Sequence, residues 1–383
     1  MKETLSILLT AVLLTVLTSC ANVSDNGRTS DAADGTFMAY DSLYAKAAEY
    51  SDKIEIKYAK GLRVSYAADG VHVFISNPDP KATANRPEEI VIKEKKQRFI
   101  CTTALQLGNF EILGLEKDIV GMNSIRNVFS PKMLTQLADG TTKRVGKEGN
   151  FDLEAIISAK PDYIFVSASK YGGFESLKEA GIPLIPHHGY KETHPLGQVE
   201  WIKLVGLLTG ETRRANAVFS EIEKQYLSLK AKVAKRTSGK QLPTVLSGRQ
   251  IRDGWYVVGG KSYMAQLFKD AGASYIMSDN SESGGVTLDF ESVYRRGLNA
   301  DYWQTDGVYD GDFTLTTLAA EDPRYADIKA YKEQHVLFCN LSQTPYRELA
   351  GLEPHILLCD FTKAFHPELL PAYQPKYYKL ISK

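Results

Sequence analysis

The sequence has no excess of either charge: Lys and Arg total 46, Asp and Glu total 46, and the net charge is zero. Phosphate contacts with nucleic acid require a basic excess, so the composition argues against a nucleic-acid partner. Cysteine is scarce as well. Beyond Cys20 the chain has Cys101, Cys339 and Cys359, an odd number without the spacing of a disulfide framework or metal site. Cys101 and Cys339 end apolar, strand-like runs, which predicts that both pack in the core.

The common catalytic and nucleotide-binding motifs are missing too. The chain contains no Gly-x-Gly-x-x-Gly, no P-loop, no Gly-x-Ser-x-Gly and no His-Glu-x-x-His. The segment Gly259–Ser262 looks like the end of a P-loop, but the glycine that should precede it stands at the wrong spacing. A helix capped by Ser262 explains the segment. We therefore predict a protein that is not an enzyme and carries no cofactor.

The N-terminus carries a short apolar run, Leu5–Leu17, behind Lys2. A run of this length indicates a secretory signal and is too short for a membrane span, and no later run is long enough to cross a bilayer. It ends in Leu-Thr-Ser-Cys, which is similar to the bacterial lipobox, so we expect residues 1–20 to be a lipoprotein signal peptide and Cys20 the lipid anchor. An ordinary cleaved signal is the alternative. Residues 21–36, rich in small polar side chains, predict a flexible tether.

The remaining chain, about 350 residues, is long enough for two domains with separate cores. Residues 37–97 predict a β-rich extension with strand-like segments over Ile54–Tyr58, Arg63–Tyr66 and Val71–Ile75, the last two of which form a hairpin. From Arg98 onward, short apolar strands alternate with helices, and a second such series starts near Pro243. This alternation predicts an α/β fold with two lobes, 98–210 and 237–383, each built on a parallel sheet.

A long amphipathic helix is predicted between the two series. Over residues 211–236, apolar side chains recur at spacings of three and four with charges on the other face, and neither Gly nor Pro interrupts the pattern. At 1.5 Å per residue such a helix spans roughly 37 Å, the scale of a whole domain. We expect one stiff connection that restricts the lobes to small relative rotations. A packing helix inside one larger domain is the alternative.

The two series share a repeated sequence motif. Asp152-Leu153-Glu154 and Asp289-Phe290-Glu291 each open a predicted helix, and each is followed by a strand entered through Asp-Tyr. Helix dipoles favour a carboxylate in the first turn, which is the structural explanation for both glutamates. Their recurrence at equivalent points of two lobes also indicates a shared role.

In order and spacing, these features resemble the iron-complex and cobalamin-type (class III) substrate-binding lipoproteins of ABC importers. The motifs that carry the resemblance are Ile119-Val120-Gly121, Lys160-Pro161-Asp162, Gly181-Ile182-Pro183, Gly259-Gly260-Lys261-Ser262, Ala271-Gly272-Ala273 and His366-Pro367-Glu368-Leu369-Leu370. The segments Glu192–Gly197 and Glu200–Lys203 resemble a Bacteroidetes-type branch. The resemblance implies that Glu154 and Glu291 dock the lobes on an ABC permease dimer. It also implies a small-molecule metal chelate as cargo and a lipid-anchored place on the periplasmic side of the cell envelope. We expect a monomer.

In a two-lobed α/β binder, the ligand lies where the carboxyl ends of parallel strands from both lobes face each other. Aromatic walls and arginines there suit a large, partly anionic ligand such as a ferric siderophore, haem or a corrinoid. The residues predicted to bind it are Thr102, Thr103, Ser169, Tyr171, Gly172 and Tyr190 in the first lobe and Arg249, Arg252, Trp255, Tyr256, Trp303, Tyr309, Tyr346 and Arg347 in the second.

Three histidines keep two other functions open. His187, His188 and His194 could serve a free transition-metal-ion binder, although adjacent residues on a strand point to opposite faces and a metal cage needs about four converging ligands. We expect these side chains on the surface or facing a tetrapyrrole. A tetrapyrrole metal chelatase or haem-handling enzyme would need a His–Glu pair in the cleft, for which His188 and Glu192 are the candidates.

Overall fold

The computed structural model describes residues 37–82, 86–123, 128–147, 149–167 and 174–383. All of them belong to one unit of mutually contacting residues, Ala32–Lys383. Cys20, the signal peptide predicted over 1–20 and the tether predicted over 21–36 lie outside the described residues, as do Ser169, Tyr171 and Gly172.

Lobe 1, from β4 to α7, is built on a parallel sheet with the strand order β10-β9-β4-β5-β6. Its strands are β4 (Phe99–Cys101), β5 (Ile119–Met122), β6 (Lys143–Arg144), β9 (Tyr163–Val166) and β10 (Leu184–Pro186), with a small ribbon of β7 (Gly146–Lys147) and β8 (Asn150–Phe151). Its helices are α2 (Ala104–Glu111), α3 (Pro131–Asp139), α4 (Leu153–Ala159), α5 (Phe174–Glu179), α6 (Pro195–Val199) and α7 (Ile202–Thr209). The central strand β4 is buried at every residue, as expected for a parallel sheet with helices on both faces.

Lobe 2, from β11 to β18, repeats this plan with the strand order β14-β11-β16-β17-β18, in which only β18 is antiparallel. The strands are β11 (Thr244–Ser247), β14 (Ser274–Tyr275), β16 (Tyr302–Gly307), β17 (Val336–Asn340) and β18 (Lys379–Leu380). The helices are α9 (Tyr263–Asp270), α10 (Phe290–Gly297), α11 (Leu315–Glu321), α12 (Lys329–Lys332), α13 (Tyr346–Leu349) and α14 (Pro354–Phe365). A second, antiparallel sheet of β12 (Arg249–Ile251), β13 (Gly254–Val258) and β15 (Gly285–Asp289) was not predicted.

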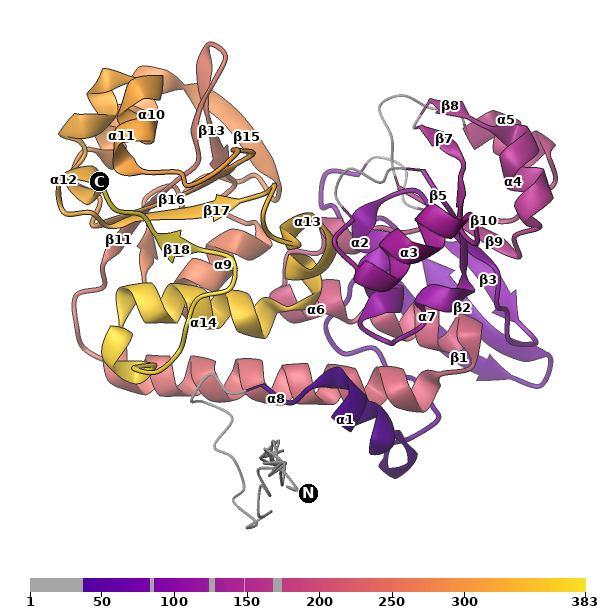
Figure 1. Cartoon of the computed structure of the whole chain (residues 1–383). Coiled ribbons are helices and arrows are strands. Elements are labelled where there is room, and N and C mark those ends of the chain that lie inside the picture. The colour runs from indigo at the N-terminus through magenta and orange to yellow at the C-terminus, as the bar shows by residue number, and fades with distance from the viewer. Residues whose placement is uncertain (1–36, 83–85, 124–127, 148, 168–173) are drawn as a thin grey trace, which may run out of the picture. The chain divides into compact units, whose positions relative to one another are not determined.

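One long helix, α8 (Thr212–Thr237), connects the lobes, with α7 of lobe 1 and α14 of lobe 2 packed along it (Figure 1). The apolar stripe read from the sequence is buried at all seven positions: Ala215, Val218, Phe219, Ile222, Tyr226, Leu229 and Val233. The predicted fold class is therefore confirmed: two α/β lobes with parallel sheets, joined by a single long helix.

The extension before lobe 1 holds α1 (Tyr40–Ala45) and an antiparallel sheet of β1 (Leu62–Ala67), β2 (Gly70–Ile75) and β3 (Glu88–Ile92). The predicted hairpin is confirmed as β1 and β2. The strand predicted over Ile54–Tyr58 is wrong, because this segment pairs with no strand and its backbone N–H groups donate to a side chain instead.

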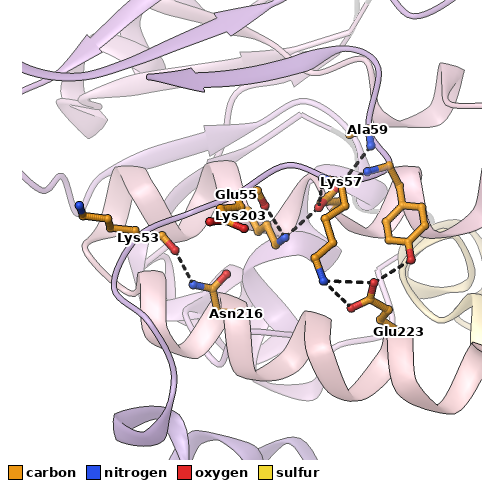
Figure 2. A network of polar contacts seen from close by, with 9 residues as sticks. Lys53, Glu55, Lys57, Ala59, Lys203, Asn216 and Glu223 are labelled. Carbon is orange, nitrogen blue, oxygen red and sulfur yellow. Dashed lines mark hydrogen bonds and ion pairs between the residues drawn. The ribbon is translucent and has the colours of Figure 1, made fainter. Parts of the chain in front are cut away.

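That side chain is Glu200, which follows α6 and is fully buried. Its carboxylate accepts hydrogen bonds from the backbone N–H groups of Lys57, Tyr58 and Ala59 at 2.7–2.8 Å, and from Lys203 Nζ at 2.8 Å. Figure 2 shows the surrounding network, in which Lys203 Nζ also donates to the carbonyl of Glu55. Glu200 thus ties the extension to lobe 1 through donors that would otherwise be buried without partners.

Glu200→Gln is expected to lower the free energy of unfolding by about 3–5 kcal/mol, since removing one partner of a buried ion pair leaves the other charge uncompensated. Urea unfolding followed by tryptophan fluorescence measures the change. Glu154→Gln, an exposed control, is expected to stay within about 0.5 kcal/mol of the wild type. Equal midpoints for the wild type and Glu200→Gln would show that Glu200 does not hold the extension.

Candidate functional site

Two adjoining cavities lie at the carboxyl ends of the lobe 2 strands. The larger, about 510 Å³, has Tyr190 and Lys191 of lobe 1 on one side and Tyr256, Tyr346 and Arg347 of lobe 2 on the other. Because its lining comes from both lobes, a ligand in it would touch both. This is the position that the strand-end argument predicts for a binding site.

The smaller cavity, about 250 Å³, is lined by lobe 2 residues that include Gly248, Arg249 and Thr305. It shares Tyr256, Asp306, Leu341 and Arg347 with the larger cavity. The two are therefore neighbouring parts of one wall, which we call the cleft wall.

Charge on the cleft wall is organised around Asp306. Burial raises the pKa of the Asp306 carboxyl, and the nearby Arg249 and Arg347 oppose that rise. Arg249 is fixed in place: its Nη1 lies 2.6 Å from Glu321 Oε1, and its guanidinium covers Gly307, where a Cβ would fall 2.3 Å from Nη2. The side chain of Arg347, by contrast, is exposed and forms no hydrogen bond or ion pair with a residue that the structure describes. Arg347 is thus available to an anionic group of a ligand.

Tyrosines supply the apolar part of the cleft wall. Tyr256 and Tyr190 are 41% and 36% exposed, unusually open for large aromatic side chains. The Tyr256 hydroxyl rests on the backbone of Gly285, where a Cβ would come within 1.8 Å of it. Behind them Tyr346 accepts a hydrogen bond from the Tyr378 hydroxyl at 3.2 Å, and burial raises the pKa of Tyr346 well above its usual value. The wall therefore offers flat surfaces for stacking, and the Tyr346 phenol stays protonated.

The structure brings together five of the residues predicted to bind ligand: Tyr190, Arg249, Tyr256, Tyr346 and Arg347. It adds Val258, Ser262–Met264 and Ser283–Gly285, which sequence reasoning missed. Val258 and Gly285 belong to the antiparallel sheet of β12, β13 and β15, whose short strands gave no periodic signal, and Ser262–Met264 are the N-cap and first residues of α9.

Two predicted ligand residues need correction. Trp255 and Trp303 are fully buried in lobe 2, where their rings pack on each other and on Tyr325. Each indole N–H donates to a backbone carbonyl, of Ser247 and Gly248 respectively. Both side chains belong to the core beneath the cleft wall and present no surface to a ligand.

Four further predicted residues line neither cavity. Thr103 is the N-cap of α2 in a capping box with Gln106, and Thr102 is buried beside it. Tyr309 packs on Phe313, and its backbone N–H donates to Asn340. Arg252 lies in the exposed turn between β12 and β13 with a φ of 57°.

The two glutamates of the repeated motif, Glu154 and Glu291, occupy equivalent helix positions. Asp152 and Asp289 cap α4 and α10, each accepting a hydrogen bond from the backbone N–H three residues on. Glu154 and Glu291 then stand in the first turns, and both are exposed. Glu291 differs in one respect, since its Oε1 lies 2.8 Å from Arg324 Nη1. The structure thus explains the repeat as matched caps and leaves both carboxylates accessible.

The histidines have three different environments. His187 is buried between Phe165 and Trp201, and neither ring nitrogen has a hydrogen-bond partner among the described residues. His188 is half-buried with its ring edge toward Trp201, and His194 stacks on Tyr58. The expectation that they lie on the surface or face a ligand is therefore wrong for His187. Across the described residues, no group of three or more His, Cys, Asp or Glu side chains is arranged to hold a metal ion.

Glu192 is a structural residue. It is 2% exposed, and its carboxylate accepts hydrogen bonds from the backbone N–H groups of Lys60 and Gly61 and from Trp201 Nε1. The His188–Glu192 pair considered for a chelatase therefore does not stand free in the cleft.

The remaining cysteines, Cys101, Cys339 and Cys359, are buried thiols, which confirms core packing for the first two. Among the helices that the structure describes, none has the length and apolar character needed to span a membrane.

Two α/β lobes joined by one long helix, with a cavity bordered by both, define a class III substrate-binding protein. A family model described as periplasmic binding protein matches residues 100–341, and the chain belongs to this family. An uncharacterized lipoprotein of Methanocaldococcus jannaschii is 26% identical over 326 residues, which cover 80% of this chain and 75% of that protein.

Solved structures show the same fold. A periplasmic haem-binding protein of Pseudomonas aeruginosa has a TM-score of 0.58 at 20% identity, covering 75% of this chain and 98% of that one. A molybdate periplasmic binding protein of Haemophilus influenzae has a TM-score of 0.56 at 16% identity, covering 74% and 90%. One architecture thus serves proteins described as binding a tetrapyrrole and a small oxyanion.

The buried His187 predicts an acid-sensitive fold. Burial, with a smaller contribution from His188, lowers the pKa of His187 to about 3, so the folded state keeps the ring neutral while the unfolded chain protonates it below about pH 6.5. Stability should therefore fall as the pH drops from about 6.5 toward 3, by up to about 1.4 kcal/mol per pH unit from this residue.

His187→Leu keeps an apolar side chain at the site and removes the titrating group. Urea midpoints measured between pH 7.5 and pH 4.5 should decline less steeply for this variant than for the wild type. Parallel curves for the two proteins would contradict the assignment.

Proposed function

We propose that this protein is an extracytoplasmic solute-binding lipoprotein that captures a metal chelate, either an iron complex (siderophore or haem) or a corrinoid, and delivers it to an ABC permease. The observation that carries the proposal is the cleft wall, where Tyr190, Tyr256 and Tyr346 stand beside Arg249 and Arg347 at the border of the two lobes. Flat aromatic faces suit a large planar or apolar ligand, and a free guanidinium suits its carboxylates.

The comparisons with known proteins support the general part of this proposal, which is the solute-binding role. The family and the solved structures of this fold are binding proteins, and one of the latter is described as binding haem. The relative from Methanocaldococcus jannaschii is named a lipoprotein, which agrees with the lipobox-like sequence at Cys20. We therefore propose that the protein lies on the periplasmic side of the cell envelope, held by a lipid on Cys20.

The cargo can be identified by titrating the full chain, purified in detergent, with haem, cyanocobalamin and ferric siderophores. Trp201, Trp255 and Trp303 are all buried, so a bound chromophore would quench them by energy transfer through space without contact. We expect saturable quenching by one of these ligands at micromolar concentration or below. Arg347→Gln should weaken binding of an anionic cargo by about tenfold or more, because a hydrogen bond to a charged group is lost.

Arg252→Gln is the matched control, since Arg252 is an exposed arginine of the same lobe that lines neither cavity. It should leave the affinity unchanged. Absence of saturable quenching by all three classes of ligand would overturn the proposed cargo, and equal effects of the two arginine variants would remove Arg347 from the site.

The proposed docking role of Glu154 and Glu291 predicts loss of transport without loss of binding. Glu154→Arg combined with Glu291→Arg should abolish ligand uptake by cells that carry the cognate permease, because reversed charges repel an arginine-lined pocket. Export and ligand affinity should stay normal. Glu179→Arg with Glu333→Arg is the control, as both are exposed glutamates, one in each lobe. Normal uptake by the Glu154/Glu291 variant would refute the docking role.

A further inference from the structure

A second large cavity lies away from the cleft wall. Its volume is about 860 Å³, and three segments enclose it: Lys57–Lys60 of the extension, Thr193–His194 of lobe 1, and α9 of lobe 2 with its flanking residues. Of the residues that the structure describes, Ser262 alone lines both this cavity and the larger cleft cavity. We call it the lysine cavity.

The charge of the lysine cavity is of one sign. Lys57, Lys60, Lys261 and Lys269 line it, and no Asp or Glu does, although the chain as a whole is neutral. Lys57 is paired with Glu223 at 3.1 Å. The side chains of Lys60, Lys261 and Lys269 are exposed, and their ammonium groups make no hydrogen bond or ion pair with a described residue. Three cations therefore face the cavity without a neutralising partner from the described chain.

Carboxylates close to the walls have partners of their own. Glu192 accepts backbone hydrogen bonds from the extension, and Asp270 accepts from Tyr226 and lies 3.1 Å from Lys230 Nζ. Glu282 is paired with Lys81. Asp270 and Glu282 are thus engaged with other residues, whereas burial raises the pKa of the Glu192 carboxyl and the nearby Lys60 opposes that rise. The positive potential of Lys261 and Lys269 stays available to an outside anion.

His194 adds a neutral donor to the lining. Its Nδ1 accepts a hydrogen bond from the backbone N–H of Leu196 at 3.1 Å, so the neutral ring carries its proton on Nε2. Burial lowers the pKa of His194, which keeps the ring neutral at neutral pH. Hydroxyl groups of Thr193, Ser274 and Ser278 complete a lining rich in donors. Donors and cations together match an acceptor-rich, negatively charged molecule.

The spacing of the lysines sets the form of that molecule. Lys261 lies two residues before the start of α9 and Lys269 lies in its last turn, so six helical residues stand between them. A molecule with several anionic groups can pair with the lysines at both ends of α9 at once, whereas a single phosphate or sulfate pairs with both only when the two flexible side chains converge on it. The volume also falls within the range of about 300–1,000 Å³ typical of small-molecule sites, and the concave form suits a free solute better than a membrane surface.

We propose that the lysine cavity is a second binding site, separate from the cleft wall, for an elongated polyanionic small molecule such as a polyphosphate or polycarboxylate. Its ligand would touch the extension and lobe 2 at once, because Lys60 and the pair Lys261 and Lys269 belong to these two parts. The site does not depend on the identity of the proposed chelate cargo.

Isothermal titration calorimetry of the full chain in a non-ionic detergent, in metal-free buffer at low ionic strength, tests this site with sodium tripolyphosphate as the probe. The wild type should bind it saturably. Lys261→Glu/Lys269→Glu should bind about tenfold more weakly or worse, because two attractive charges become repulsive. Lys261→Gln/Lys269→Gln, which introduces no repulsion within the fold, should show a smaller loss in the same direction.

Lys178→Glu/Lys235→Glu is the matched control: it changes the net charge by the same amount through two exposed lysines outside the cavity. It should bind the probe within about twofold of the wild type. Inorganic phosphate should bind at least about tenfold more weakly than tripolyphosphate. Absence of saturable binding, an equal loss in the control, or equal affinity for the single phosphate would each overturn the proposal.

Discussion

The carboxylate of Glu200 is the interaction on which the arrangement of extension, lobe 1 and connecting helix depends. It is fully buried, and it accepts from three consecutive backbone N–H groups of the extension and from Lys203 Nζ. Lys203 in turn lies 3.9 Å from the ring centroid of Phe219 on α8. Burial lowers the pKa of Lys203, and the attraction of Glu200 opposes that shift.

This anchorage makes the extension a brace along α8. Upstream of it, Asn216 holds the backbone of Ser51 and Lys53, and Tyr40 donates to Glu353 of lobe 2. Downstream, Lys81 pairs with Glu282, again in lobe 2. The extension therefore touches both lobes as well as the helix between them. When the lobes rotate relative to each other, these contacts must either move with a lobe or break. Together with the stiffness of the single helix, they restrict closure of the lobes to small angles.

The sequence predicted long-range periodicity well and short-range geometry poorly. The apolar stripe of α8 and the alternation of strands and helices depend on many residues, so local exceptions did not alter them. The rule that ligands bind at the carboxyl ends of parallel strands then identified Arg249, Tyr256 and Arg347. These residues follow such strands, and the topology places the ends of the strands at one edge of the sheet. The prediction that Trp255 binds ligand was wrong. Neighbouring residues on a strand point to opposite faces, and the sequence did not determine which of them faces the core. The turn at Arg252 was invisible, because positive φ at an arginine has no sequence signal.

The cleft wall and the lysine cavity carry different cationic side chains, and this difference affects which ligand each can bind. Arg249 in the cleft wall is fixed by Glu321 and lies flat on Gly307, so it presents an oriented fork beside Asp306. A fork of this kind selects a carboxylate in one orientation, and neighbouring aromatic faces fix the rest of a rigid ligand. The lysine cavity offers flexible point charges on exposed stems, which follow a variable anion without orienting it. Under the two proposals, the cleft wall would select its ligand by shape and orientation, and the lysine cavity would bind a polyanion with little demand on its orientation.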